Sequence, residues 1–165
     1  MEPASLAALR DGSLAGARAV RLSANLREVP RELLALADTL EVLDLSGNAL
    51  VALPDWFAGF RRLRVLFCSN NPFAVLPPVL GDCAALCQVG FRDCGIREVP
   101  AEALPPELRW LTLTGNRIGR LPDAIGRRPR LRKLMLAGNR LAALPESLAG
   151  AAELELLRLA GNRLV

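Results

Sequence analysis

The sequence has no histidine and no tyrosine, and aromatic residues make up only 4% of its 165 residues. It also has no apolar run of about 18 residues, the minimum for a membrane-spanning helix, so we expect no membrane span. Residues 1–16 contain no basic segment followed by an apolar one, so they do not resemble a secretion signal. We therefore predict a cytoplasmic protein.

Further absences concern catalysis. Without histidine the chain lacks the side chain most often used as a general acid or base. There is no GxGxxG loop, no HRD and no DFG, so the motifs of protein kinases do not occur. We expect no enzymatic activity within this chain, no catalytic residue and no cofactor.

What the chain does contain is leucine in a fixed phrase, LxxLxLxxNxLxxLP, which returns every 22 or 23 residues. A period of this length predicts a solenoid of stacked, similar units. A looser first unit begins at Ala17, and the incomplete last unit begins at Leu154. The units between them begin at Leu40, Leu63, Leu86, Leu108 and Leu131. We predict seven units over residues 17–165, preceded by a capping half-unit over residues 1–16.

Within each unit, apolar residues at the fourth and sixth positions alternate with variable ones, which is typical of a short strand with one buried face. Stacking the units places these strands side by side in a parallel sheet. The LxxLP segment then turns the chain, and a short helical or irregular stretch returns along the outside. Because the strands are thinner than the return segments, we predict a curved α/β solenoid with the sheet on its concave face.

An asparagine follows the strand in most units, and its amide can both donate and accept hydrogen bonds. We predict a structural role at the turn for Asn25, Asn48, Asn71, Asn116, Asn139 and Asn162. Cys94 takes this position in the fourth unit, which is one residue shorter and has Gly90 in its strand. We expect that unit to be the least stable.

The repeat also accounts for the cysteines. Cys68 and Cys83 fall at inward positions and Cys94 at the asparagine position, where small buried side chains are expected. Together with Cys87 they form no CxxC pair. We therefore predict neither a metal site nor a disulfide.

The phrase identifies residues 17–165 as a member of the leucine-rich repeat proteins. Segments such as LRVLFCSNN, LPPELRWLTLTGNRI and LRKLMLAGNRLAALP resemble the N-terminal array of bacterial leucine-rich repeat protein kinases. This resemblance implies a sensing or docking role in signalling, upstream of a phosphotransfer domain. Secreted bacterial effectors with leucine-rich repeats are a poorer match, because their units are shorter.

Variable residues that face out of the strands form three columns on the concave face. Phe67, Trp110 and Met135 give this face an apolar middle around Gly90, whose lack of a side chain lets another backbone approach. Exposed aromatic and arginine residues are typical of interface hot spots, although β-propensity alone is an alternative explanation. We predict that a protein or peptide binds through Phe67, Arg92, Trp110, Thr112, Lys133, Met135, Leu156 and Arg158.

Arg117, Arg140 and Arg163 follow the asparagine in three successive units and form a candidate anion-binding column. An acidic tail, a phosphopeptide or nucleic acid could dock there, and a solvated flank is the alternative. Nucleic acid is not favoured, because no aromatic residue alternates with these arginines. The last unit leaves leucines such as Leu157 at an uncapped edge, which indicates either a fragment of a longer array or self-association through that edge.

Asp44 and Asp93 are the only acidic residues in or beside the columns, and they lie two units apart, so they do not suggest a catalytic pair. We predict a non-enzymatic scaffold that recognises a protein or peptide on its concave face. The alternative is the regulatory repeat segment of a Ser/Thr-type protein kinase whose catalytic domain lies outside this chain.

Overall fold

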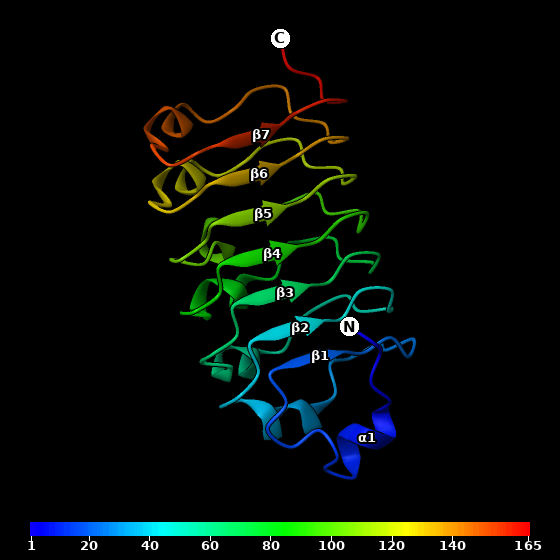
Figure 1. Cartoon of the computed structure of the whole chain (residues 1–165). Helices are drawn as coiled ribbons and strands as arrows, with labels where there is room; N and C mark the ends of the chain where they lie inside the picture. Colours follow the sequence, from blue (N-terminus) through cyan, green and yellow to red (C-terminus); the bar gives the residue numbers. More distant parts are fainter.

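The computed structural model describes all of residues 1–165 and shows seven short parallel strands stacked in chain order (Figure 1). Neighbouring strands pair in register, with Val20 of β1 beside Leu43 of β2 and Leu43 beside Leu66 of β3. The strands are β1 (Ala19–Arg21), β2 (Val42–Asp44), β3 (Val65–Phe67), β4 (Gln88–Gly90), β5 (Trp110–Thr112), β6 (Lys133–Met135) and β7 (Leu156–Arg158). The predicted parallel sheet of a solenoid is confirmed.

The return segments are short 3-10 helices on the opposite side of the core from the sheet (Figure 1). A proline precedes each one, because its ring fixes φ and its missing N–H needs no partner there. The helices are η1 (Arg31–Leu36), η2 (Asp55–Gly59), η3 (Pro78–Asp82), η4 (Ala101–Ala103), η5 (Asp123–Arg127) and η6 (Glu146–Gly150). The helices, of which η1 with six residues is the longest, include none that could span a bilayer.

One continuous core of 40 buried residues runs between the sheet and the return helices. Strand leucines such as Leu43 and Leu66 are fully buried. Phe57 and Phe60 pack edge to face with ring centroids 5.1 Å apart. All four cysteines are free thiols and are buried.

Five asparagines form a ladder at the ends of the strands, and we call them the Asn ladder: Asn48, Asn71, Asn116, Asn139 and Asn162. Each amide bonds the main chain of its own unit and of the unit before it. In Asn116, Nδ2 donates to the carbonyl oxygens of Phe91 at 2.7 Å and Leu113 at 2.9 Å. Its Oδ1 accepts from the backbone N–H groups of Cys94 at 3.1 Å and Ile96 at 3.0 Å. The ladder therefore satisfies buried backbone groups that the short strands leave unpaired.

Asn25 does not belong to this ladder, so the structural role predicted for it is wrong. Its backbone is left-handed, with φ of 51°, and the residue is exposed. Oδ1 of Asn48 accepts instead from the N–H groups of Ala24 at 3.1 Å and Leu26 at 3.0 Å. Ala24 thus takes the ladder position in the first unit. This unit is therefore one residue short before Ala24, not after it.

Cys94 takes the ladder position in the fourth unit. Its Sγ lies 3.3 Å from the carbonyl oxygen of Cys68 and 3.3 Å from that of Arg92. In the other units, the N–H two residues after the ladder position donates to the ladder amide of the next unit. The equivalent N–H of the third unit, that of Phe73, donates instead to the carbonyl oxygen of Asn71 at 2.9 Å. The thiol thus replaces the donor half of the amide with a weaker group. That this unit is the least stable stays a prediction.

The return helices pack unevenly. A Cβ atom added to Gly81 of η3 would lie 1.8 Å from the carbonyl oxygen of Glu102, and one added to Gly126 of η5 would lie 2.2 Å from that of Ser147. These glycines let η3 lie directly against η4 and η5 against η6. The fourth unit is one residue shorter in its return segment, and an open hollow of about 520 Å³ remains beside η4, between the fourth and fifth units.

The N-terminal helix α1 (Leu6–Arg10) lies at the β1 end of the solenoid (Figure 1). Oγ of Ser5 caps it by accepting from the N–H of Ala8 at 3.0 Å. Leu9 joins the core, and the N–H of Ala4 donates to the carbonyl oxygen of Arg21 in β1 at 2.7 Å. At the β7 end, Leu157 is 37% exposed.

Candidate functional site

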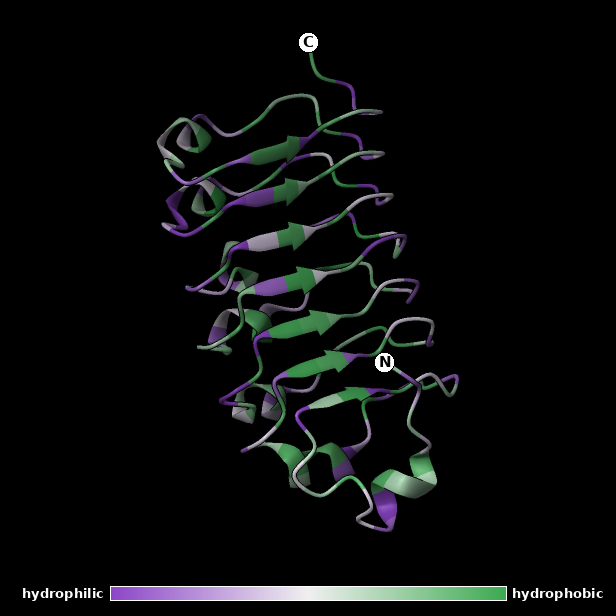
Figure 2. Ribbon diagram, in the orientation of Figure 1, coloured by the Kyte–Doolittle hydropathy of each residue, from purple (hydrophilic) through white to green (hydrophobic).

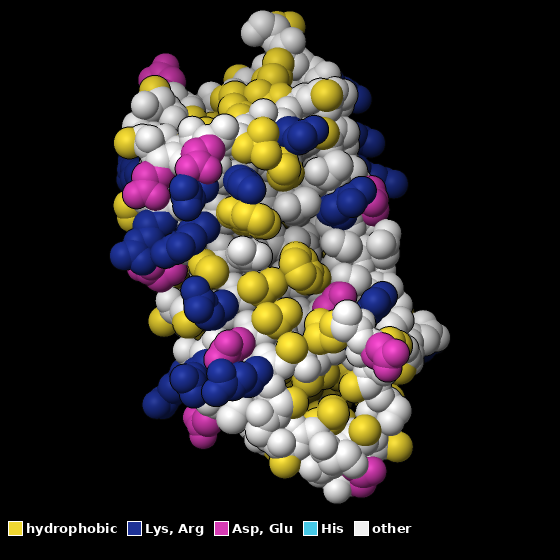
Figure 3. All heavy atoms as spheres, in the orientation of Figure 1, with side chains coloured by type: hydrophobic (Ala, Val, Ile, Leu, Met, Phe, Trp, Pro, Cys, Tyr) yellow, Lys and Arg dark blue, Asp and Glu magenta, His cyan; other side chains and the backbone are white.

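The outward-facing residues of the strands form one open face (Figure 3). Hydrophobic side chains follow the middle of this face, and lysine and arginine gather towards its two edges (Figure 3). The strands themselves change along the solenoid, because β2 and β3 are mostly hydrophobic whereas β6 begins with a hydrophilic residue (Figure 2). The face therefore offers apolar contact in the centre and positive charge around it.

Strand register brings the predicted partner-binding residues together. One row holds Phe67, Gly90, Thr112, Met135 and Arg158 on consecutive strands. A second row holds Trp110, Lys133 and Leu156, and Arg92 follows β4. We call the eight predicted residues the concave patch: Phe67, Arg92, Trp110, Thr112, Lys133, Met135, Leu156 and Arg158.

Phe67 and Trp110 are the exposed aromatic side chains of the concave patch, and each is 39% exposed. Nζ of Lys133 lies 3.9 Å from the centroid of the Trp110 ring. Such a cation–π contact contributes about 0.5–1 kcal/mol at an exposed site.

Gly90 is covered by its neighbour. A Cβ atom at Gly90 would lie 2.8 Å from Cδ1 of Phe67, and the glycine is buried. The hypothesis that another backbone approaches Gly90 is therefore wrong. Its missing side chain instead lets the Phe67 ring lean across β4, which extends the apolar surface from β3 towards β5.

The charges of the concave patch are mostly positive. Arg92 makes one long contact, 3.9 Å from Nη2 to Oδ2 of Asp93, and both side chains are exposed, so the pair contributes little. Arg158 takes part in no ion pair. Asp44 forms an ion pair with Arg21, with 3.6 Å between Oδ2 of Asp44 and Nε of Arg21. The concave patch thus places three cationic side chains, those of Arg92, Lys133 and Arg158, beside an apolar centre.

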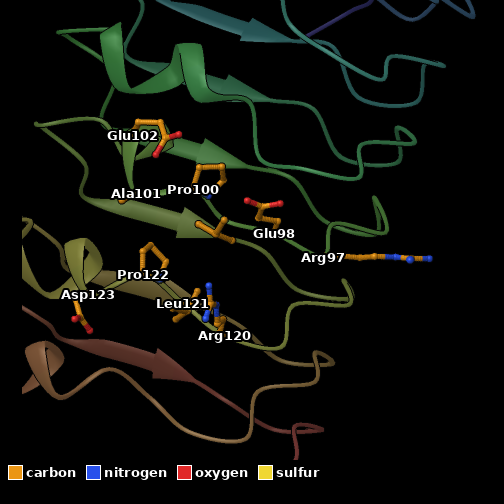
Figure 4. A pocket seen from close by; sticks show the side chains of 10 residues that line it. Arg97, Glu98, Pro100, Ala101, Glu102, Arg120, Leu121, Pro122 and Asp123 are labelled. Carbon is orange, nitrogen blue, oxygen red and sulfur yellow. The ribbon is translucent and has the colours of Figure 1, made fainter.

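The hollow between the fourth and fifth units is a feature that sequence reasoning missed (Figure 4). Its lining carries both signs of charge, and Arg97 extends away from it (Figure 4). The sequence signal was the single residue missing after Ala103. Glu98, Glu102 and Asp123 line the hollow, but no group of three metal-ligating residues comes together there, and we assign it no site.

Three of the buried thiols are kept in the neutral form. Burial raises the pKa of Cys68 well above its ordinary value, raises that of Cys83 to about 11, and also raises that of Cys94. Thiolate is the reactive species, so these cysteines are inert at neutral pH. They belong to the core and not to a site.

The raised pKa values of these thiols predict that the protein loses stability at alkaline pH. In the unfolded chain a thiol ionises near pH 9.0, whereas folded Cys83 ionises at about 11. Between these two pH values the folded state keeps a proton on Cys83 that the unfolded state releases. The contribution of Cys83 to the free energy of unfolding is therefore fully present below pH 9.0 and is lost as the pH rises towards 11. With no tyrosine and one lysine, few other groups titrate in this window. Urea unfolding should show a smaller alkaline loss for Cys83→Ala than for the unchanged chain, and equal losses would contradict this assignment.

The stacked strands, the Asn ladder and the proline-led return helices define a solenoid of leucine-rich repeats. Two family models, both described as leucine-rich repeats, match residues 106–164 and residues 39–60. The chain belongs to the leucine-rich repeat proteins.

Among curated proteins, the chain is 34% identical over 95 residues to human PH domain leucine-rich repeat-containing protein phosphatase 1, covering 55% of this chain and 5% of that protein. It is 41% identical over 68 residues to mouse leucine-rich repeat serine/threonine-protein kinase 1, covering 41% of this chain and 3% of that protein. The chain thus spans only a small part of these relatives. The matching kinase is a mouse protein, so the likeness to kinase repeats is not confined to bacterial ones.

Solved structures agree with this fold. The leucine-rich repeat domain of the type III effector XopL has a TM-score of 0.82 at 26% identity, covering 93% of this chain and 55% of that chain. TLR13 in complex with ssRNA13 has a TM-score of 0.77 at 28% identity, covering 88% and 21%. The ectodomain of the Arabidopsis receptor kinase GASSHO1/SCHENGEN3, in complex with CASPARIAN STRIP INTEGRITY FACTOR 2, has a TM-score of 0.74 at 28% identity, covering 93% and 19%.

Proposed function

We propose that this protein is a recognition scaffold whose concave patch binds a protein or peptide partner. The observation that carries the proposal is the pair of aromatic side chains, Phe67 and Trp110, each 39% exposed on an ordered sheet. An exposed apolar surface rimmed by charge is typical of an interaction site. Tryptophan and arginine, both present here, are enriched among the residues that dominate binding energies.

The fold supports this role because the patch is already ordered. Its strands are joined by backbone hydrogen bonds, and their other face is packed into the core. Binding to such a surface costs little ordering of the scaffold, so more of the contact energy appears as affinity. Two neighbours at 28% identity are repeat proteins in complex with a ligand, one with CASPARIAN STRIP INTEGRITY FACTOR 2 and one with ssRNA13.

A protein or peptide fits the patch better than nucleic acid does. Stacking of successive bases needs a series of accessible aromatic rings along a basic groove. Here Lys133 already lies over the Trp110 ring, and Phe67 lies on Gly90. We assign Phe67, Trp110, Met135 and Leu156 to apolar contact, and Arg92, Thr112, Lys133 and Arg158 to selection of polar and acidic groups.

The double variant Phe67→Ala/Trp110→Ala tests the proposal. Peptides would be selected from a random library against the unchanged chain, and their affinities measured by fluorescence anisotropy. We expect the double variant to keep its fold, because neither ring lies in the core, and to lose binding by at least about 100-fold. Val51→Ala/Val75→Ala is the matched control, because it removes exposed apolar side chains outside the strands, and it should change binding less than about twofold.

Two results would count against the proposal. If the selected peptides bind the double variant as tightly as the unchanged chain, the patch is not the binding surface. If circular dichroism shows the double variant unfolded, the two rings contribute to the core and the assignment of the strand faces is wrong.

A second candidate is the regulatory repeat segment of a Ser/Thr-type protein kinase. The observation that favours it is the 41% identity over 68 residues to mouse leucine-rich repeat serine/threonine-protein kinase 1. The transcript that encodes this chain provides the test. HRD and DFG motifs in the same reading frame after Val165 would support the kinase assignment, and a stop codon or an unrelated domain there would exclude this form of it.

A further inference from the structure

A second surface lies at the edge where β5, β6 and β7 end. Arg117, Arg140 and Arg163 each follow a member of the Asn ladder, and we call them the Arg column. All three are exposed. Their backbones are held alike, because each N–H donates at 2.8–2.9 Å to a carbonyl oxygen of the preceding unit, namely those of Ile96, Ile118 and Leu141.

The turns that carry the Arg column are in contact with one another. Each contains a glycine with positive φ: Gly115 at 73°, Gly138 at 68° and Gly161 at 71°. A Cβ atom on Gly138 would lie 3.5 Å from Cα of Gly115, and one on Gly161 would lie 3.4 Å from Cα of Gly138. The three arginines therefore leave the backbone at roughly the 5 Å spacing of neighbouring strands.

The Arg column has no partner of opposite charge within the protein. None of its members takes part in an ion pair, whereas Arg130 pairs with Glu107 and Arg132 with Glu155. Residues 112–118, 135–141 and 158–164 contain no acidic side chain. Like charges directly beside each other on neighbouring strands are destabilising. A bound anion would remove this repulsion.

The column is confined to one part of the array. The corresponding residues of the second, third and fourth units are Ala49, Pro72 and Gly95, none of which is charged. Asp93 and Arg92 of the fourth unit, which pair with each other at 3.9 Å, mark the end of this surface. The surface meets the concave patch at Arg92, whereas the other members of the patch lie in the strands.

The surface beside the Arg column carries only small side chains. Thr114, Ala137 and Ala160 occupy the last outward position of their units, next to the three glycines. These small residues leave room for an extended main chain to lie along the solenoid, and the Asp93 side chain, which lies against Gly115, borders this room at the fourth unit. No aromatic residue lies in residues 113–118, 136–141 or 159–165, so nucleic-acid bases would have no ring to stack on.

We propose that the Arg column binds an extended, carboxylate-rich segment of a partner protein. Guanidinium groups form forked hydrogen bonds to carboxylates, which gives geometry as well as charge. Alternate side chains of an extended segment lie on one face about 6.7 Å apart. This exceeds the spacing of the turns only slightly, and the long arginine side chains can bridge the difference.

The test uses the full chain and a fluorescein-labelled decapeptide of alternating glutamate and glycine, measured by anisotropy at about 0.15 M salt. The triple variant Arg117→Gln/Arg140→Gln/Arg163→Gln should weaken binding at least about tenfold. The matched control is Arg61→Gln/Arg62→Gln/Arg64→Gln, which removes the same charge from a different edge, where these arginines line a small hollow beside Glu41. The control should change the affinity less than about twofold.

Three results would overturn the proposal. The first is absence of binding to the unchanged chain, or undiminished binding to the Arg-column variant. The second is equal weakening in both triple variants, which would show attraction by net charge alone. The third is tighter binding of a single-stranded thymidine decamer that is lost in the Arg-column variant, which would assign the surface to phosphate. Because Phe67→Ala/Trp110→Ala leaves the Arg column unchanged, this variant should bind the glutamate peptide normally and so separates the two proposals.

Discussion

Replacing Asn116 with alanine is expected to lower the free energy of unfolding by at least about 4 kcal/mol. Its amide serves four backbone groups, at distances of 2.7–3.1 Å, in a residue that is only 5% exposed. Each buried group left without a partner costs about 1–3 kcal/mol. Water cannot easily replace the amide, because the groups lie between the fourth and fifth units. Urea denaturation followed by circular dichroism measures the loss.

Two further variants provide comparisons that test this prediction. Asn25→Gly should stay within about 0.5 kcal/mol of the unchanged chain, because Asn25 is exposed and its left-handed backbone suits glycine. Asn116→Cys should lose less than Asn116→Ala, because Cys94 shows that a thiol can supply the donor half of the amide. An Asn116→Ala variant no less stable than Asn25→Gly would mean that the Asn ladder is dispensable.

Gly81→Ala is expected to cost about 3 kcal/mol or more. The added Cβ would lie 1.8 Å from the carbonyl oxygen of Glu102 and 2.9 Å from its carbonyl carbon. Both are backbone atoms, so relief requires η3 and η4 to move apart, and overpacking of this kind usually costs about 1–3 kcal/mol even where only side chains must shift. The φ of Gly81 lies outside the left-handed region, so the clash alone causes the loss.

The matched control for Gly81 is Gly59→Ala. Gly59 is the last residue of η2, one position beyond the counterpart of Gly81, and an added Cβ there would have no atom within 4 Å. Alanine should leave the stability unchanged or raise it by up to about 1 kcal/mol, because it restricts the unfolded chain. Hydrogen exchange should show the loss in Gly81→Ala concentrated in η3 and η4. Equal stabilities for the two variants would contradict the close packing of these helices.

The repeating part of the fold could be predicted from the sequence because one short phrase determines it. Leucines at alternate positions leave a single choice of buried face, and a constant period leaves a single way to stack the strands. The position of Asn25 could not be predicted in this way. A unit with one residue missing can be aligned with the gap on either side of the asparagine, and only the hydrogen bonds from Asn48 to Ala24 and Leu26 distinguish the two alignments.

The same distinction applies to the candidate sites, because some of their features follow from the repeat and others depend on packing. Strand alternation placed the residues of the concave patch on one face, because in-register pairing carries a column from unit to unit. It could not show that the Phe67 ring covers Gly90, since that depends on the side-chain rotamer. Nor could it show the hollow beside η4, which depends on how two return helices of different length meet.

The Asn ladder also bears on how such a chain can change over generations. Each rung joins a unit only to its predecessor, through the same few backbone atoms. Duplication or loss of a whole unit by recombination would leave every other rung intact, whereas an insertion within a strand would shift one face against the next. New binding surface can therefore be gained a complete repeat at a time, and a duplicated fifth or sixth unit would bring another arginine to the Arg column in the same event.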